Sequence, residues 1–279
     1  MTTAEENSIL TRVGPGTPCG ELLRRYWHPV GILPDLSDTT PTKYVRILGE
    51  DLVLFRDQSG RVGLLADHCS HRGASLLYGR VEKRGIACAY HGWLYDTEGN
   101  CLETPAEPEG SLFHLTVKQR AFPVREHYGL YWAYLGPAPA PVLPRYDVME
   151  TGPLQQVQVS WRPDCNWLQV VENNLDQSHV FILHQETGEW GAAMRGTTMR
   201  GEATSNSTRG LIGQLDGLEY SEEPFGIRRK QVHKGGYADI DLLVFPGTMR
   251  IYNSLSIKVP IDDTHTNRYH VSANLGVGG

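Results

Sequence analysis

Four residues in one stretch of the chain carry side chains that bind soft metals. Cys69 and His71 open the stretch and Cys88 and His91 close it, in the pattern C-x-H-x16-C-x2-H. We expect each pair on a turn beside a strand, so that two loops clamp one metal centre. Structural zinc sites usually combine C-x2–4-C with H-x3–5-H pairs. One cysteine and one histidine per loop favour a two-iron, two-sulfide cluster, with both thiolates on one iron and both imidazoles on the other.

This ligand pattern and its flanking residues, CSHRG and CAYHGW, resemble the Rieske iron–sulfur family. The resemblance implies that Cys69 and Cys88 bind one iron of a [2Fe–2S] cluster, and that His71 and His91 bind the solvent-facing iron. Replacing two thiolates by neutral imidazoles raises the reduction potential of such a cluster. The glycine in each loop allows the backbone to pass close to the sulfides and to donate N–H groups to them.

A second group of candidate ligands lies in ENNLDQSHVFILH, where Asp176, His179 and His184 form D-x2-H-x4-H. We expect a helix over residues 164–184, on which Asp176 and His179 share one face. His179 and His184 are about 140° apart on a regular helix. They converge on one ion only if the helix loosens into a π-type turn or ends, which predicts irregular backbone between them. The alternative is an ordinary amphipathic helix with two incidental histidines.

Two histidines and a carboxylate on one face leave iron positions open for oxygen and substrate. Together the two motifs resemble the α subunits of Rieske non-haem iron aromatic ring-hydroxylating oxygenases, in the phthalate dioxygenase-like group that includes aromatic O-demethylases. The segments GELLRRYWHP, NWLQVVENNLDQSHVFILH and VPIDDTHT also carry this resemblance. It implies that His179 and His184 bind a mononuclear Fe(II), while Asp176 links His179 to His91 of a neighbouring subunit. Such a relay requires a head-to-tail ring, and we expect a homotrimer or a higher multiple.

The third iron ligand of that family is an aspartate on a late helix, for which we find no candidate in this chain. Asp262 and Asp263 match a strand segment of the family, and Asp239 and Asp241 lie in a strand-like run. Either the sequence is truncated and its remainder supplies the carboxylate, or it is a short form with an incomplete or absent second iron. We prefer truncation, because a missing terminal helix would expose apolar surface and an incomplete triad would bind Fe(II) weakly.

Composition limits the classes of partner and compartment. The net charge of -6, without runs of like charge, argues against nucleic acid and anionic membranes. No window approaches 18 apolar residues, and the N-terminus lacks a signal-peptide pattern. Five cysteines, an odd number, indicate a reducing compartment, and we expect a cytoplasmic protein.

The 279 residues favour two domains in an α+β fold. We expect an N-terminal helical segment over residues 1–40, a small all-β Rieske domain over 41–145, and a catalytic domain over 146–279 whose C-terminal part is missing. The catalytic domain is expected to be a helix on an antiparallel sheet, similar to a helix-grip fold. Alternating patterns predict three strands over residues 43–67, a hairpin in GWLYDTEGNCLE, two strands in FPVREHYGLYWAYLG, a strand near 154–161, and further strands within residues 197–279.

The resemblance implies a terminal oxygenase that activates O2 at mononuclear Fe(II) to hydroxylate or O-dealkylate an aromatic, carboxylated substrate. Electrons would arrive through the cluster from a separate NAD(P)H-dependent flavin and iron–sulfur reductase. One alternative is an electron-transfer or redox-sensing protein without an active second iron. Another is a colourless, zinc-stabilised scaffold. Neither the exact substrate nor the number of oxygen atoms inserted follows from the sequence.

Overall fold

The computed structural model describes residues 2–150, 154–161, 163–176, 179, 215–234 and 236–273. Within these ranges the strands form four antiparallel sheets. No helix in the described part of the chain has the length and apolar content needed to cross a lipid bilayer.

Two small sheets form the predicted all-β part of the chain. The first sheet has β2 (Thr42–Ile47), β3 (Glu50–Arg56) and β4 (Val62–Ala66), and the second has β5 (Arg80–Glu82), β6 (Gly85–Ala87), β7 (Leu94–Tyr95) and β8 (Cys101–Glu103). The three strands expected over residues 43–67 and the hairpin of β7 and β8 are thereby confirmed. Aromatic and aliphatic side chains with less than a tenth of their surface exposed fill the space between the sheets, among them Phe55, Leu65, Ile86 and Trp93.

A third sheet joins the N-terminal segment to the middle of the chain. After α1 (Ala4–Thr11) and α2 (Pro18–Leu23), the chain enters β1 (Trp27–Ile32), which pairs with β10 (Leu130–Tyr134). β10 in turn pairs with β9 (Val124–His127), the other strand of the predicted hairpin. The sequence indicated helix but no strand within residues 1–40. A proline is unexpected in a strand, so Pro29 made β1 hard to predict from the sequence. It is tolerated there because β1 is an edge strand whose register shifts after Pro29.

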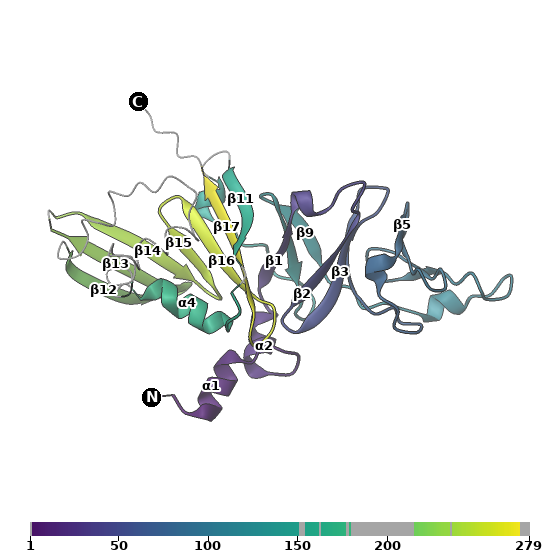
Figure 1. The fold of residues 1–279 in the computed structure, drawn as a ribbon, viewed down its shortest axis with the longest axis horizontal. Coiled ribbons are helices and arrows are strands. Elements are labelled where there is room, and N and C mark those ends of the chain that lie inside the picture. The colour runs from purple at the N-terminus through teal and green to yellow at the C-terminus, as the bar shows by residue number, and fades with distance from the viewer. Residues whose placement is uncertain are drawn as a thin grey trace, which may run out of the picture.

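The fourth sheet has seven strands and carries the helix predicted to bear metal ligands. Its order is β11 (Leu154–Trp161), β17 (Thr266–Ala273), β16 (Ser254–Pro260), β15 (Thr248–Ile251), β14 (Ala238–Val244), β13 (Gly226–His233) and β12 (Leu215–Glu223). One face lies toward the third sheet, where Val157 contacts Gly129. The other face carries α4 (Trp167–Leu175), which lies across the strands in Figure 1. A helix on an antiparallel sheet beside a small all-β unit confirms the predicted α+β class.

The molecule is elongated, as Figure 1 shows. The seven-stranded sheet lies at one end, the sheet of β1, β9 and β10 lies in the middle, and β5 lies at the far end. Loops beside β5 and α4 therefore lie far apart within one chain.

Candidate metal centres

Two loops at the far end of the small sheets have matching backbone geometry. In each loop the cysteine N–H donates to the carbonyl five residues later, and the N–H of the glycine four residues later donates to the cysteine carbonyl. The N···O distances are 2.8 to 2.9 Å, for Cys69 with Gly73 and Ala74 and for Cys88 with Gly92 and Trp93. Both glycines have left-handed φ, +71° and +72°. Because residues with a Cβ rarely adopt this conformation, the sequence needs glycine at the same place in both loops.

The two cysteine thiols lie together beneath these loops. Cys69 and Cys88 are both buried and free of disulfides, and the Cys88 thiol is near enough to raise the pKa of the Cys69 thiol. Tyr95 Oη lies 3.2 Å from Sγ of Cys69. Burial raises the pKa of the Cys69 thiol, while the Tyr95 hydroxyl and the backbone N–H of His71 act in the opposite direction. Two neighbouring thiols of this kind are suited to bind one metal ion. The Tyr95 hydroxyl and the His71 N–H are already placed to hydrogen-bond to the Cys69 sulfur.

The two histidines lie on the solvent side of the thiols. The His71 and His91 rings meet edge to face, with centroids 4.6 Å apart. His71 also stacks on Trp93 at 4.3 Å with nearly parallel planes, and Tyr90 packs on His91. Both imidazoles are half-buried. Within the described ranges, no three His, Cys, Asp or Glu side chains close around a single point as ligands of one ion would. The donors form a buried thiol pair and an outer imidazole pair.

Gln119 supports the first loop and carries no sequence signal that would have identified it. Its Oε1 accepts the Ser70 N–H at 2.8 Å, and its Nε2 donates to the carbonyls of Ala66 and His68 at 2.7 and 3.0 Å. The side chain is buried. The Tyr95 hydroxyl adds a bond to Ser70 Oγ at 2.9 Å. Because these contacts join residues about 50 positions apart, only the folded chain reveals them.

The second group of candidates lies where α4 ends. The sequence predicted a helix through residue 184 with Asp176 and His179 on one face, but α4 ends at Leu175 and Asp176 has an extended backbone. The shared-face argument is therefore wrong, although the two side chains still meet, with Asp176 Oδ2 and His179 Nδ1 3.4 Å apart. Asn173 Nδ2 lies 3.5 Å from His179 Nε2. His184, and the irregular backbone predicted between residues 179 and 184, lie outside the described residues.

The aspartates considered as a third ligand have other partners. Asp241 is buried and pairs with Arg229 at 2.6 Å. Asp239 accepts from His233 and Tyr252, and Asp262 accepts from Thr264 and His265. Asp263 accepts the Val13 N–H. All four carboxylates are therefore engaged in ion pairs or hydrogen bonds in this structure.

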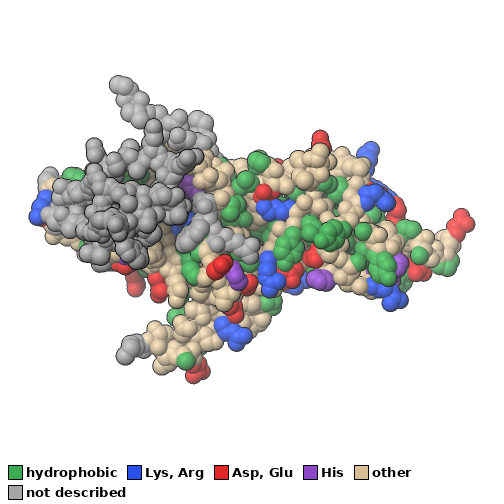
Figure 2. All heavy atoms as spheres, viewed as in Figure 1, with side chains coloured by type: hydrophobic (Ala, Val, Ile, Leu, Met, Phe, Trp, Pro, Cys, Tyr) green, Lys and Arg blue, Asp and Glu red, His purple; other side chains and the backbone are tan. Residues whose placement is uncertain are grey.

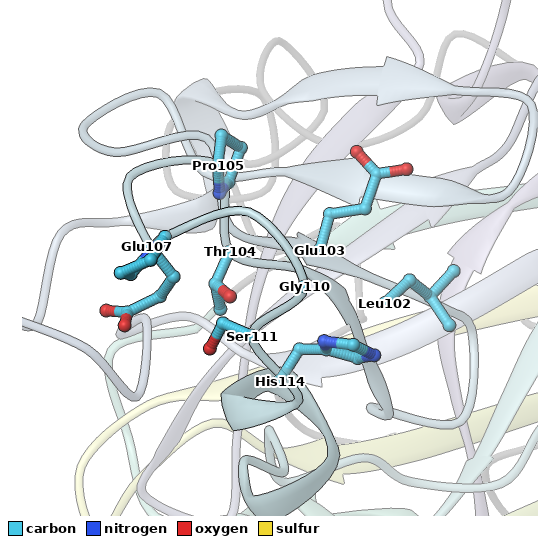
Figure 3. A pocket seen from close by; sticks show the side chains of 9 residues that line it. Leu102, Glu103, Thr104, Pro105, Glu107, Gly110, Ser111 and His114 are labelled. Carbon is cyan, nitrogen blue, oxygen red and sulfur yellow. The ribbon is translucent and has the colours of Figure 1, made fainter.

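A surface hollow of about 280 Å³ lies beside the second loop (Figure 3). It is lined by backbone and by side chains that include Glu103, Thr104, Glu107, Ser111 and His114. Pro105 separates it from Gly92, whose Cβ, if present, would lie 3.3 Å from the proline ring. Neither candidate metal centre contributes a ligand to its lining. We therefore do not assign the substrate to this hollow.

Comparison with known proteins finds one matching domain model and several similar oxygenase subunits. The model of the Rieske [2Fe-2S] domain matches residues 26–123. The phthalate 4,5-dioxygenase oxygenase subunit of Pseudomonas putida is 38% identical over 290 residues, which cover 98% of this chain and 64% of that protein. This chain contains a Rieske [2Fe-2S] domain and is similar in sequence to oxygenase subunits that are about one and a half times its length or more. The 5,5'-dehydrodivanillate O-demethylase oxygenase subunit of Sphingobium sp. (strain NBRC 103272 / SYK-6) is 46% identical over 203 residues, covering 71% of this chain and 46% of that subunit.

Solved structures share the fold. NdmA of Pseudomonas putida CBB5, as the QL mutant with theobromine, superposes with a TM-score of 0.67 at 22% identity, covering 90% of this chain and 73% of that one. The terminal oxygenase of carbazole 1,9a-dioxygenase from Nocardioides aromaticivorans IC177 gives a TM-score of 0.67 at 19% identity, covering 90% and 76%. This chain spans 46% to 64% of the length of four curated relatives that it matches.

The match to the Rieske [2Fe-2S] domain confirms the first expected cofactor, a [2Fe–2S] cluster, while the mononuclear non-haem iron stays a prediction. The first fits the observed donors, because buried thiols and outer imidazoles are the two unlike ligand pairs that this cluster takes. The left-handed glycines remove side-chain bulk where the backbone passes the ligands. At the second centre, His179 is of a residue type that ferrous iron sites use, and Asp176 lies beside its Nδ1.

Proposed function

We propose that this chain is the oxygenase component of a Rieske system, using O2 to hydroxylate or O-dealkylate an aromatic compound. The observation that carries the proposal is the pair of loops with a buried thiol pair and an outer imidazole pair. The contact between Asp176 and His179 at the end of α4 supports a second metal centre in the same chain. When bound, the cluster supplies single electrons and the mononuclear iron supplies the oxygen chemistry.

In this proposal Cys69 and Cys88 hold the inner iron of the cluster, and His71 and His91 hold the outer one. The Tyr95 hydroxyl donates to the Cys69 sulfur, which stabilises the additional negative charge of the reduced cluster. Trp93 stacks on His71 and keeps its ring orientation fixed. Because the imidazoles are the outer ligands, the edge of the cluster would lie close to any protein that docks on this end of the molecule.

His179 and His184 are the proposed protein ligands of the mononuclear iron, and Asp176 is the proposed carboxylate between two imidazoles. Asp176 faces Nδ1 of His179 at 3.4 Å, so it can accept the Nδ1 proton and leave Nε2 for the metal. Its side chain is 51% exposed within one chain. This exposure leaves a carboxylate oxygen accessible to a second imidazole, which we assign to His91 of a neighbouring subunit.

In Figure 1, α4 lies on the seven-stranded sheet, whereas β5, whose sheet carries the second loop, lies at the opposite end of the molecule. A ring of head-to-tail subunits would bring the cluster of one subunit to α4 of the next, and we propose a homotrimer or a multiple of it. On the face in Figure 2, hydrophobic side chains gather among charged ones over the small sheets. Exposed large apolar side chains near the cluster loops include Tyr78, Tyr90, Leu112 and Leu115. An apolar surface around the imidazoles is suited to contact with another protein chain.

The substrate is proposed to be an aromatic acid or ether. Relatives of this chain are named for phthalate, phenoxybenzoate and 3-chlorobenzoate, which are carboxylated aromatics. Electrons are proposed to come from a separate NAD(P)H-dependent reductase carrying flavin and an iron–sulfur centre. A related carbazole 1,9a-dioxygenase oxygenase has been solved in complex with a ferredoxin. Five cysteines without disulfides fit the proposed cytoplasmic location.

Iron content and oxygen transfer test the proposal. An oxygenase holds about three irons per chain, two in the cluster and one mononuclear, whereas an electron carrier holds about two. We expect the reduced protein to show the electron paramagnetic resonance (EPR) signal of a Rieske cluster. With a reductase and an aromatic acid, we expect product labelled from 18O2. Two irons per chain with no labelled product from any aromatic acid would support the carrier, and a colourless protein would support the zinc scaffold.

A further inference from the structure

A buried ion pair on the seven-stranded sheet lies beneath the end of α4. Arg229 on β13 is directly opposite Asp241 on β14. Nε and Nη2 of Arg229 donate to Asp241 Oδ2 at 3.2 and 2.6 Å, and Gln231 Nε2 donates to the same oxygen at 2.9 Å. Arg229 is 5% exposed and Asp241 is 3% exposed. Three donors on one buried carboxylate oxygen hold the guanidinium in a single place on the sheet.

The third nitrogen of the same guanidinium reaches the helix. Nη1 of Arg229 donates to the carbonyl oxygens of Asn174 and Leu175 at 2.8 and 3.3 Å. Tyr220 Oη, on β12, also donates to the Leu175 carbonyl at 2.7 Å. The last carbonyls of a helix have no partner within the helix, and they carry the negative end of its dipole. A positively charged donor fixed to the sheet satisfies both requirements.

The position of this contact gives it a functional consequence. Leu175 is the last residue of α4, and Asp176 follows it directly with an extended backbone. The other end of α4 is held by Asn166, whose Nδ2 donates to the carbonyls of Thr11 and Asp263. Hydrogen bonds therefore hold both ends of α4 to the rest of the fold. Those at its C-terminal end lie next to Asp176, the proposed bridging carboxylate.

We propose that Arg229 is a positioning residue, which fixes the end of α4 to Asp241 and thereby sets the location of Asp176 and His179. This inference rests on the proposed function for the roles of Asp176 and His179, but the attachment itself does not depend on it. The substitution Arg229→Lys would keep a positive charge near the end of α4. A single ammonium cannot span Asp241 and both carbonyls as the planar guanidinium does, so a lysine restores the attachment only in part.

The adjacent arginine provides a matched control. Arg228 follows Ile227 on β13, and its side chain points to the opposite face of the sheet, as alternate strand residues do. It pairs with Glu223 at 3.0 Å and its side chain is 44% exposed. Arg228→Gln removes the same chemical group one residue away without touching α4.

The experiment compares Arg229→Gln, Arg229→Lys and Arg228→Gln as purified chains loaded with iron. We would measure the cluster EPR signal, the EPR spectrum of the nitric oxide adduct of the mononuclear ferrous site, and single-turnover oxidation from the pre-reduced cluster. Arg229→Gln is expected to keep the cluster signal, alter the nitrosyl spectrum, and slow single turnover about 10- to 100-fold, because small displacements cost rate steeply. Arg229→Lys should fall between this variant and the parent, and Arg228→Gln should match the parent.

Hydrogen exchange of the peptide covering residues 167–176 separates this inference from the proposed function. Faster exchange at the end of α4 in Arg229→Gln, but not in Arg228→Gln, is expected whether or not the parent binds a third iron. If Arg229→Gln does not fold, Arg229→Lys serves for the same comparison. Absence of mononuclear iron in the parent would overturn the proposed function and, with it, the functional half of this inference. A nitrosyl spectrum, turnover rate and exchange rate in Arg229→Gln equal to those of Arg228→Gln would overturn the positioning role.

Discussion

The hydroxyl of Tyr95 lies 3.2 Å from the sulfur of Cys69 and 2.9 Å from the hydroxyl of Ser70. Tyr95 is on β7, the strand that follows the second loop along the chain, and it is fully buried. One phenol thus connects the thiol of the first loop to the strand that follows the second. A donor to a ligand sulfur stabilises the reduced form of a cluster, because reduction adds negative charge to the sulfurs.

Tyr95→Phe is expected to lower the reduction potential of the cluster. Loss of a hydrogen bond of about 1 kcal/mol corresponds to a fall of about 40 mV for a one-electron couple. Redox titration followed by the cluster EPR signal measures it, with Tyr78→Phe, at an exposed position, as the control. A potential unchanged in Tyr95→Phe, or lowered equally in Tyr78→Phe, would contradict the role of this hydroxyl.

Gly92→Ala is expected to reduce the cluster content of the protein. Alanine at φ +72° costs about 1 to 2 kcal/mol, and its Cβ would also approach Pro105 to 3.3 Å. Gly60→Ala is the control, because Gly60 has φ +88° with open space around it and lies in the turn between β3 and β4. We expect both variants to lower Tm, but only Gly92→Ala to lower iron and acid-labile sulfide per chain. Equal loss of iron in both would mean that strain alone, and not the loop geometry, controls cluster binding.

Asp176→Asn is expected to separate electron delivery from metal binding. The amide keeps the size of the side chain but loses the negative charge that faces His179 Nδ1 at 3.4 Å. Both iron centres should stay loaded, while single-turnover oxidation from the reduced cluster falls about 100-fold or more, as for other orienting carboxylates. The surface variant Asp164→Asn should behave as the parent. Parent-like turnover in Asp176→Asn would remove this carboxylate from the proposed electron route.

His28 is expected to make the stability of the protein depend on pH in mildly acidic solution. Burial lowers its pKa from 6.5 to about 4, the Leu23 carbonyl that it contacts at 2.8 Å opposes this shift, and Arg24 adds to it. Because the folded pKa lies below the unfolded one, the stabilisation is complete above pH 6.5 and is lost as pH falls toward 4. Its full size is about 3 kcal/mol, from 1.36 kcal/mol per pKa unit.

Urea unfolding at a series of pH values checks this dependence. His28→Gln should flatten the fall in unfolding free energy between pH 6.5 and 4. His127→Gln, at an exposed position, is the control and should leave the fall as it is in the parent. If the unfolding free energy of both variants falls between pH 6.5 and 4 as steeply as that of the parent, His28 does not titrate as its burial implies.

Local patterns were sufficient for much of the fold. Alternating apolar residues separated by Gly49-Glu50 and by residues 57–60 predicted β2, β3 and β4 almost to the residue. β1 was missed because Pro29 interrupts its pattern, and only pairing with β10 makes this segment a strand. The predicted helix is interrupted after Leu175, where Asp176 has an extended backbone, although His179 is again helical. Apolar periodicity continues past Leu175, whereas the contacts of Arg229 and Tyr220 with the last carbonyls are made in the tertiary structure.

For the candidate metal centres, the types and spacing of the residues were enough to predict a chemistry. Residue types and spacing named two thiols, two imidazoles and the glycines of their loops, because ligand identity and left-handed backbone are properties of single residues and short segments. Only the tertiary structure decided how these groups meet and what holds them. Gln119, Tyr95 and Arg229 act through partners that are distant in the chain, and no local pattern encodes which distant groups become neighbours after folding.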